Sequence, residues 1–155
     1  MNRWRKVWRL SQAERWLLVQ AAFALPAVAA LIRLKGLREC QATLARLAPT
    51  GDNRRPAAGV PAEALAHTVT RMVTAAAAHG PYRANCLQRS VALWWLLRRR
   101  GLTSELRIGT RTHAGRFEAH AWVEFDGMVL NDSRDVHARF TPFDRSVNPS
   151  EARYS

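Results

Sequence analysis

The sequence has 155 residues, of which 48% are hydrophobic and 23% are charged. A chain of this length suits one domain with a sizeable core, and the hydrophobic content argues against disorder. The formal net charge of +12 favours an acidic peptide, a nucleic acid or an anionic membrane as partner. The arginines are scattered along the chain without a nucleic-acid fold signature, so we expect a solvated arginine-rich surface and no nucleic-acid partner.

The N-terminal region begins with a basic, tryptophan-bearing segment over residues 1–10. Ser11, followed three residues later by Glu14, forms a capping-box pattern that predicts a helix start. The next stretch, 16–32, carries no charge and predicts a buried helix. A helix on a membrane surface is the second interpretation of this stretch, and a cleaved signal is the third. Pro26 is expected to kink or split the helix.

A further helix is predicted over residues 33–47, and a loop rich in turn-forming residues follows over 49–56. This loop is the expected boundary between an N-terminal helical region, residues 1–50, and a catalytic part, residues 57–155, within one compact unit. Pro61 stands in a favourable position to open the next helix.

An apolar helix is predicted to begin directly after Asn85. Gly80-Pro81 is a turn signal, and Asn85 can cap the helix that follows it. Cys86 then lies in the first turn, where unpaired N–H groups and the helix dipole favour a thiolate. A buried, inert structural cysteine fits this position equally well. The apolar positions at helical spacing are Leu87, Val91, Trp94 and Leu97.

A hairpin is predicted further along the chain. The segment 117–125 alternates between two faces, which predicts a strand, and His120 lies on the face with its polar residues. Asp126-Gly127 is a hairpin signal, and residues 128–130 supply the returning strand. Taken alone, His120 favours a structural strand histidine, and Asp132 favours a turn former at the end of the hairpin.

Cys86, His120 and Asp132 together predict a cysteine-protease triad. A thiol attacks a carbonyl as thiolate and therefore needs a nearby base. His120 would take the thiol proton and later protonate the leaving amine, while Asp132 would fix the tautomer and orientation of the imidazole. The backbone N–H of Cys86 is a natural oxyanion donor. Asn85 and Gln88 are candidates for a second donor, although capping or surface exposure explains both equally well.

The length of the turn at Asp126-Gly127 decides whether Asp132 can reach His120. A two-residue loop would pair Ala121 with Asp132 and put the two side chains on opposite faces. A three-residue loop, with Gly127 left-handed in a bulge, would place them side by side. The triad therefore predicts the three-residue loop. With a two-residue loop, Asp132 would need another route to the imidazole.

Shorter elements are predicted around this hairpin. Residues 105–109 form a strand candidate, and residues 110–115 form a polar hairpin connection. From Ser133 onward the periodicity is lost, and Pro142 and Pro149 argue against long elements.

Five segments follow one another in order through the second half of the chain. They are Asn85-Cys86-Leu87, Arg99-Arg100-Gly101-Leu102, Leu106-Arg107-Ile108-Gly109, Ala119-His120-Ala121-Trp122-Val123-Glu124 and Val129-Leu130-Asn131-Asp132. This ordered set, within about residues 80–135, resembles the lasso-peptide B proteins, which are leader peptidases with a transglutaminase-like, papain-related core. The resemblance implies an α+β fold, in which a central cysteine-bearing helix packs on a small antiparallel sheet and N-terminal helices lie beside it. It also implies that Cys86 is the nucleophile, His120 the base and Asp132 the orienting acid.

The same resemblance implies a substrate and partners. The expected reaction is removal of the leader peptide from a ribosomally made lasso-peptide precursor, before an ATP-dependent lasso cyclase closes the ring. The chain is short for a protease that also carries a leader-recognition domain, so it resembles the split form, which receives the leader from a separate leader-recognition protein. Two alternatives remain open. One is an acyl-transfer enzyme of the same fold. The other is a non-enzymatic basic module that binds a membrane surface, through its N-terminal region, or binds another protein.

The two cysteines, Cys40 and Cys86, could pair, but their spacing indicates no disulfide framework. A paired Cys86 could not act as a nucleophile, so the protease interpretation requires a reducing compartment and a cytoplasmic location. The sequence has no phosphate-binding glycine loop and no paired-cysteine zinc motif, and a fourth ligand for a Cys/His/Asp metal site is not evident. We therefore expect neither a metal nor a cofactor.

Overall fold

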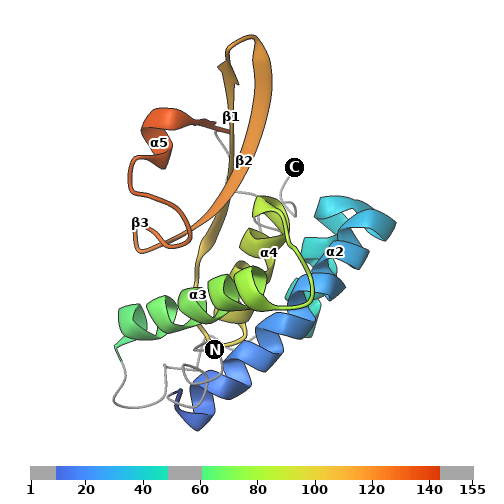
Figure 1. Cartoon of the computed structure of the whole chain (residues 1–155), viewed down its shortest axis with the longest axis vertical. Coiled ribbons are helices and arrows are strands. Elements are labelled where there is room, and N and C mark those ends of the chain that lie inside the picture. The colour runs from blue at the N-terminus through green and yellow to red at the C-terminus, as the bar shows by residue number, and fades with distance from the viewer. Residues whose placement is uncertain (1–9, 49–60, 144–155) are drawn as a thin grey trace.

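The computed structural model describes residues 10–48 and 61–143. The predictions for residues 1–9, for the loop over 49–56 and for the chain after residue 143 lie outside these residues. Within them the chain forms, in order, α2 (Gln12–Leu47), α3 (Ala62–His79), α4 (Cys86–Arg98), β1 (Glu105–His113), β2 (Arg116–Phe125), β3 (Met128–Val129), α5 (Val136–Arg139) and β4 (Thr141–Pro142). The fold is mixed α+β, as predicted. Figure 1 shows the three long helices gathered at one end and the β1–β2 hairpin projecting from them.

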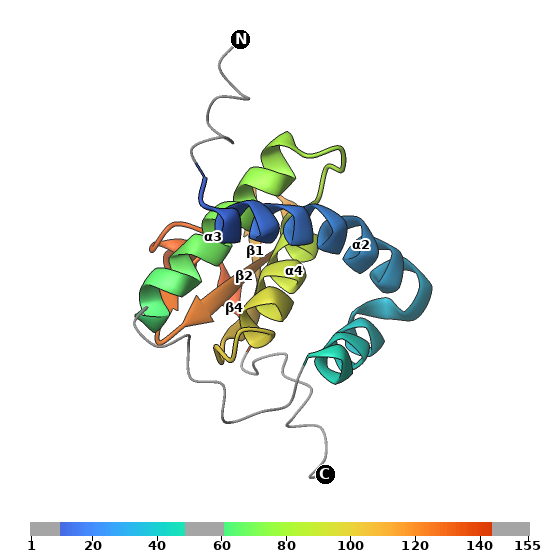
Figure 2. The ribbon, with the colours of Figure 1, turned by 90° about the horizontal axis from the view of Figure 1, so that it is seen from below.

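Helix α2 begins at the predicted capping box, with Ser11 accepting a hydrogen bond from the N–H of Glu14. Of the predicted kink or split at Pro26, the split is wrong, because the backbone stays helical there. The break lies at Gly36, which has φ of 79° and ψ of 170°. Glycine adopts this positive φ without the steric cost that a Cβ brings. After Gly36 the helix folds back on itself (Figure 2). Burial of Leu25 and Val28 on either side of Pro26 holds the helix together across the proline.

The helices and the sheet share one hydrophobic core. Helix α4 packs against α2, α3 and β2, and its apolar side chains form the centre of the core. The predicted buried helix over 16–32 is buried on one face only, because Trp16 and Phe23 on its other face are exposed. The division into residues 1–50 and 57–155 stays a prediction. Core residues come from both regions: Leu25, Val28, Val69, Met72, Val91, Leu96, Leu106 and Val123.

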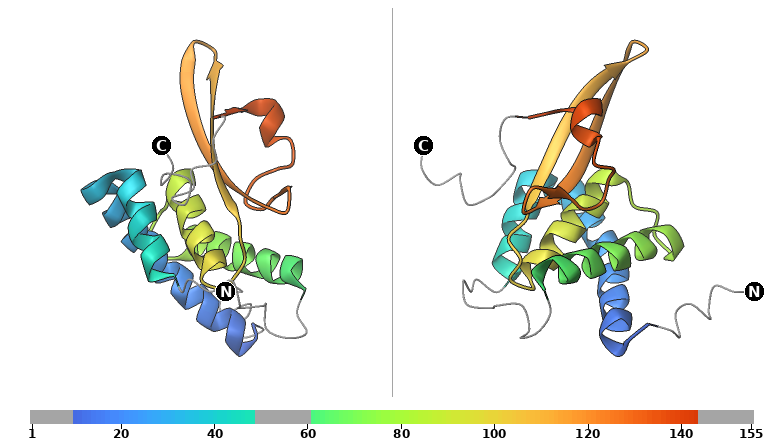
Figure 3. Two further views of the ribbon diagram at one scale, coloured as in Figure 1. Left: turned by 180° about the vertical axis from the view of Figure 1, so that it is seen from behind. Right: turned by 90° about the vertical axis from the view of Figure 1, so that its left-hand side faces the viewer.

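The antiparallel sheet has the strand order β3-β2-β1-β4. Strand β1 is longer than the predicted 105–109, because Thr110 pairs with Ala119 and His113 pairs with Arg116. The predicted connection over 110–115 therefore shrinks to the two residues Ala114 and Gly115, which both have positive φ. Such two-residue turns match the right-handed twist of a hairpin. Figure 3 shows the resulting long ribbon from two sides, with α5 beside its middle part.

Candidate active site

The first turn of α4 carries the predicted nucleophile. Asn85 caps the helix as predicted: its side chain accepts from the N–H of Gln88 at 2.9 Å, and its own N–H donates to the Gln88 side chain at 3.1 Å. Cys86 is the first residue of the helix, is partly exposed and is not in a disulfide. The hydroxyl of Tyr82 donates a further bond to Gln88. Asn85 and Gln88 thus serve as capping residues, which leaves the second oxyanion donor unassigned.

The turn between β2 and β3 contradicts the register that the sequence predicted. Phe125 pairs with Met128 and Glu124 pairs with Val129, so the loop has two residues and not three. Asp126 and Gly127 have φ of 50° and 75°. Positive φ at both positions defines the turn type that aspartate-glycine favours in hairpins, and this local preference overrides the bulge.

Asp132 reaches His120 by another route, because the chain leaves the sheet before the pairing would reach Asp132. The N–H of Leu130 still donates to the carbonyl of Val123, at 2.9 Å. At the next position the side chain of Asn131, not its backbone, accepts the N–H of Val123, at 2.8 Å. The chain then turns back over β2, and the Oδ2 atom of Asp132 hydrogen-bonds Nε2 of His120. The structure therefore brings together two of the three predicted residues.

The second oxygen of Asp132 is also occupied. Its Oδ1 accepts from the N–H of Ser133 at 2.6 Å and from the guanidinium of Arg139 at 2.7 Å. Burial by itself raises the pKa of Asp132, but the hydrogen bonds from His120, Ser133 and Arg139 outweigh burial and lower the pKa below its usual value. Asp132 is therefore held as a carboxylate, the form that can accept the imidazole N–H.

Aromatic stacking fixes the plane of the His120 ring. Its centroid lies 4.9 Å from that of Phe140 and 6.2 Å from that of Trp122, and both pairs are nearly parallel. Because Nε2 is bonded to the carboxylate of Asp132, it carries the proton in the neutral ring, and Nδ1 is the basic nitrogen. An imidazole in this tautomer can accept a proton at Nδ1 while the carboxylate stabilises the resulting cation.

Two side chains, the buried Ser90 and the half-buried Asn131, hold α4 against the edge of β2. The hydroxyl of Ser90 donates to the carbonyl of Ala121 at 2.9 Å and accepts from the amide of Asn131 at 2.9 Å. The odd-numbered residues of β2 direct their backbone N–H and C=O groups to the edge on which β3 pairs. The hydrogen bonds from β3 and Leu130 extend along this edge only as far as Val123. Beyond that point the side chains of Asn131 and Ser90 replace the missing strand. Helix α4 thus approaches β2 where β3 has ended.

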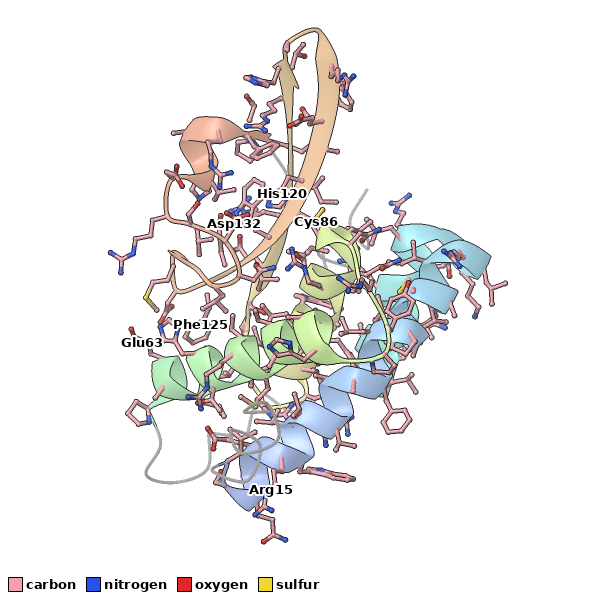
Figure 4. All side chains as sticks on the ribbon, in the orientation of Figure 1. Arg15, Glu63, Cys86, His120, Phe125 and Asp132 are labelled. Atoms are coloured by element: carbon pink, nitrogen blue, oxygen red, sulfur yellow. The ribbon has the colours of Figure 1, made fainter. Side chains whose placement is uncertain are left out.

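Cys86 lies one helical turn before Ser90 and hence farther along the same open edge. Figure 4 shows Cys86 at the start of α4, beside the part of β2 that carries His120, and Asp132 pairs with His120 from the segment after β3. Across residues 10–48 and 61–143, no hydrogen bond joins the thiol to the imidazole. The site thus consists of a paired histidine and aspartate with a free thiol beside the strand that carries the histidine.

Sequence patterns did not reveal four of the residues around this site. Ser90 and Asn131 have ordinary polar identities, and Arg139 and Phe140 belong to a segment without periodicity. The one sequence feature that could have pointed to any of them is the position of Asn131 directly before Asp132. As for metals, the described part of the chain contains no group of three or more His, Cys, Asp or Glu residues that could hold an ion.

Two comparisons with known proteins assign the chain to a class. The family model described as the transglutaminase-like superfamily matches residues 21–145, and the chain belongs to this superfamily. Over 60 residues the chain is 35% identical to the microcin J25-processing protein McjB of Escherichia coli. That alignment covers 39% of this chain and 28% of McjB. No solved structure matches. The two matches support the resemblance to the lasso-peptide B proteins.

Proposed function

We propose that the protein is a cysteine peptidase that removes the leader from a ribosomally made lasso-peptide precursor. Cys86 is the nucleophile, His120 the general base and Asp132 the residue that orients the imidazole. The observation that carries this proposal is the hydrogen bond between His120 and a carboxylate held ionised, beside the free thiol at the start of α4. Membership of the transglutaminase-like superfamily and similarity to a microcin-processing protein support it.

The proposed reaction has two halves. Nδ1 of His120 takes the proton of the Cys86 thiol, and the thiolate attacks the carbonyl of the last leader residue. The N–H of Cys86 donates to the oxyanion, and the imidazolium then protonates the departing amine of the core peptide. Water, deprotonated by the same imidazole, cleaves the thioester. This step releases the leader with a free carboxylate and restores the thiol.

The reaction defines partners before and after it. A separate leader-recognition protein would deliver the precursor, and an ATP-dependent lasso cyclase would use the amine that the cleavage sets free. Both cysteines are unpaired in the structure, which suits a thiol enzyme of a reducing cytoplasm.

An acyl-transfer enzyme is the second candidate, because the superfamily is typically composed of cysteine proteases and acyltransferases. In that case an amine rather than water would resolve the same thioester. Mass analysis of the leader separates the two reactions, since hydrolysis leaves a carboxylate and transfer leaves an amide.

The test is incubation of the purified protein with a leader-bearing precursor and its recognition protein, followed by mass spectrometry. Wild type, Cys86→Ala and Cys40→Ala would be compared, and Cys40→Ala is the matched control because Cys40 is buried in α2. We expect cleavage at one bond by wild type and Cys40→Ala, and none by Cys86→Ala. Cleavage by a folded Cys86→Ala variant, or none by folded wild type with its recognition protein present, would refute the peptidase proposal.

A further inference from the structure

The outward side of α2 forms an apolar stripe. Trp16, Phe23 and Leu34 are 63%, 73% and 81% exposed, whereas the opposite side of the helix lies in the core. A helix on the surface of a soluble domain is normally polar on its outer side, whereas on this side of α2 an apolar surface is left uncovered by residues 10–48 and 61–143. The α2 stripe consists of Trp16, Val19, Phe23, Ala27, Ala30 and Leu34, all exposed and spaced by three or four residues.

Positive charge borders the α2 stripe at both ends. Arg15 precedes the stripe, and Arg33, Lys35 and Arg38 lie around its C-terminal end. All four side chains are exposed. The sequence has no aspartate or glutamate between Arg15 and Arg38. Aromatic residues with flanking cations fit a surface that is apolar inside and anionic at its rim, which describes an anionic lipid bilayer.

Contacts of α2 with the rest of the chain determine how it can meet such a surface. Glu14 pairs with Arg71 of α3, and Gln20 accepts from Arg100 at 2.7 Å. In length and composition α2 could cross a membrane, but a third of its most apolar window is buried in the protein. If α2 crossed a membrane, its buried face would leave the core and these two interactions would break. If α2 lies on the surface of a bilayer, both are kept and the fold stays intact.

We propose that the α2 stripe docks the protein on the surface of an anionic membrane. Trp16 and Phe23 insert between the headgroups, and the flanking cations contact lipid phosphates. The test is flotation of the full-length protein with vesicles of phosphatidylcholine alone, or of phosphatidylcholine with an equal part of phosphatidylglycerol. The variant Trp16→Ser/Phe23→Ser removes the aromatic part of the stripe. Phe117→Ser is the matched control, because Phe117 is as exposed as Phe23 but lies on β2.

We expect binding to the anionic vesicles only, weakened by salt, and at least about tenfold lower partitioning for the double variant. The control should bind like wild type. Absence of wild-type binding, equal binding to both vesicle types, or equal binding by the double variant would each overturn the proposal. A dimer in solution that the double variant loses, without vesicle binding, would also overturn it and assign the stripe to a second copy.

Independently of α2, the pair Ser90 and Asn131 connects the three segments that carry the proposed triad. Ser90 is fully buried and belongs to the helix that begins with Cys86. Its partner Ala121 follows His120 directly, and Asn131 precedes Asp132 directly. Cys86 lies four residues before Ser90, so a shift of α4 along β2 moves the thiol by the same amount.

We infer that Ser90 and Asn131 are positioning residues that set the separation between the Cys86 thiol and Nδ1 of His120. This inference rests on the proposed peptidase function. Misplacement by about 1 Å can cost about a hundredfold in rate even when no reacting group is touched. We therefore expect Ser90→Ala and Asn131→Ala to lower kcat by about 10- to 100-fold and to leave KM within about twofold.

Alkylation of Cys86, measured against pH in a Cys40→Ala background, provides a second readout that needs no substrate. Loss of alignment with the imidazole should slow the alkylation of Cys86, because the base that removes the thiol proton is displaced. Ser104→Ala is the matched control, because Ser104 is also buried but its hydroxyl has no partner in the described part of the chain.

The two readouts distinguish failure of the inference from failure of the proposed function. An altered alkylation profile in a protein without turnover would refute the peptidase proposal and retain the positioning role. Unchanged kcat and an unchanged alkylation profile in both folded variants would refute the positioning role. Equal losses in Ser104→Ala would also refute it, because they would show a general effect of removing buried hydroxyls.

Discussion

The two faces of β2 differ in what they contact. Val123 and Phe125 point into the main core and pack with the helices, and Ala121 is buried on the same face. His120 and Trp122, on the other face, pack against the segment after β3 in a smaller aromatic cluster with Val136 and Phe140. One strand thus carries a stabilising face and a chemical face. Substitutions on the two faces should affect different measurements.

The chemical face is expected to give the largest effect. His120→Ala should lower turnover by about 1000-fold or more, because a positioned general base contributes about 10²- to 10⁴-fold. The side chain is only partly buried, so the free energy of unfolding should change by about 1 kcal/mol or less. Precursor cleavage and thermal unfolding of the same sample provide the two measurements. Loss of the folded state together with turnover would contradict the separation of the faces.

A substitution on the stabilising face should lower stability and leave turnover almost unchanged. Val123→Ala removes two methyl groups from a site with 0% exposure and should cost about 2 kcal/mol of unfolding free energy. The backbone N–H that donates to Asn131 is retained, so turnover per folded molecule should stay near that of wild type. Denaturant unfolding measures the free energy of unfolding. Titration of Cys86 with an alkylating agent counts the folded active sites, to which the turnover rate is normalised. A turnover loss comparable to that of His120→Ala would show that the two faces are not separable.

A substitution at Gly109 should affect both stability and turnover. Gly109 pairs with His120 across the β1–β2 ladder, and a Cβ at this position would come within 2.8 Å of the Trp122 indole and 3.0 Å of the Thr141 carbonyl. Gly109→Ala should therefore shift Trp122, cost about 1 kcal/mol or more of stability and lower kcat several-fold. Unfolding and kinetics on Gly115→Ala provide the comparison, because a Cβ there meets no neighbour within 4 Å but the positive φ strains the backbone, so stability should fall while kcat stays unchanged. A decline of both quantities in Gly109→Ala alone would establish the coupling.

Local patterns in the sequence predicted the helix starts well. Ser11 with Glu14 and Asn85 with Gln88 are three residues apart, and each pair forms the capping box that this spacing predicts. Such bonds depend on neighbouring residues alone, so they can be inferred without the fold. The strand around His120 was predicted for the same reason, since alternation is also local.

Features that depend on distant residues could not be predicted. The register of β3 follows from the local turn, but the early end of the ladder could not be predicted, because there the side chains of Asn131 and of Ser90, 41 residues away in the sequence, replace the missing strand. The break in α2 was expected at Pro26, but packing in the core holds the helix there and the chain bends at Gly36. The pairing of Asp132 with His120 was anticipated from the chemistry, although the path of the chain to it was wrong. The catalytic roles of the three residues stay predictions.

The smallest expected effect concerns the acid stability that Asp132 contributes. Its pKa in the folded protein lies below the usual 3.8, so folding favours the carboxylate. This contribution is fully present above pH 3.8 and is lost as the pH falls through the folded pKa. Asp132→Asn lacks it, so the stability difference between wild type and variant should shrink as the pH falls below about 4. Chemical unfolding at a series of pH values measures it, with Asp126→Asn in the exposed turn as control. A difference that grows as the pH falls below about 4 would mean that Asp132 is stabilised in its protonated form, and an orienting carboxylate for His120 would then be untenable.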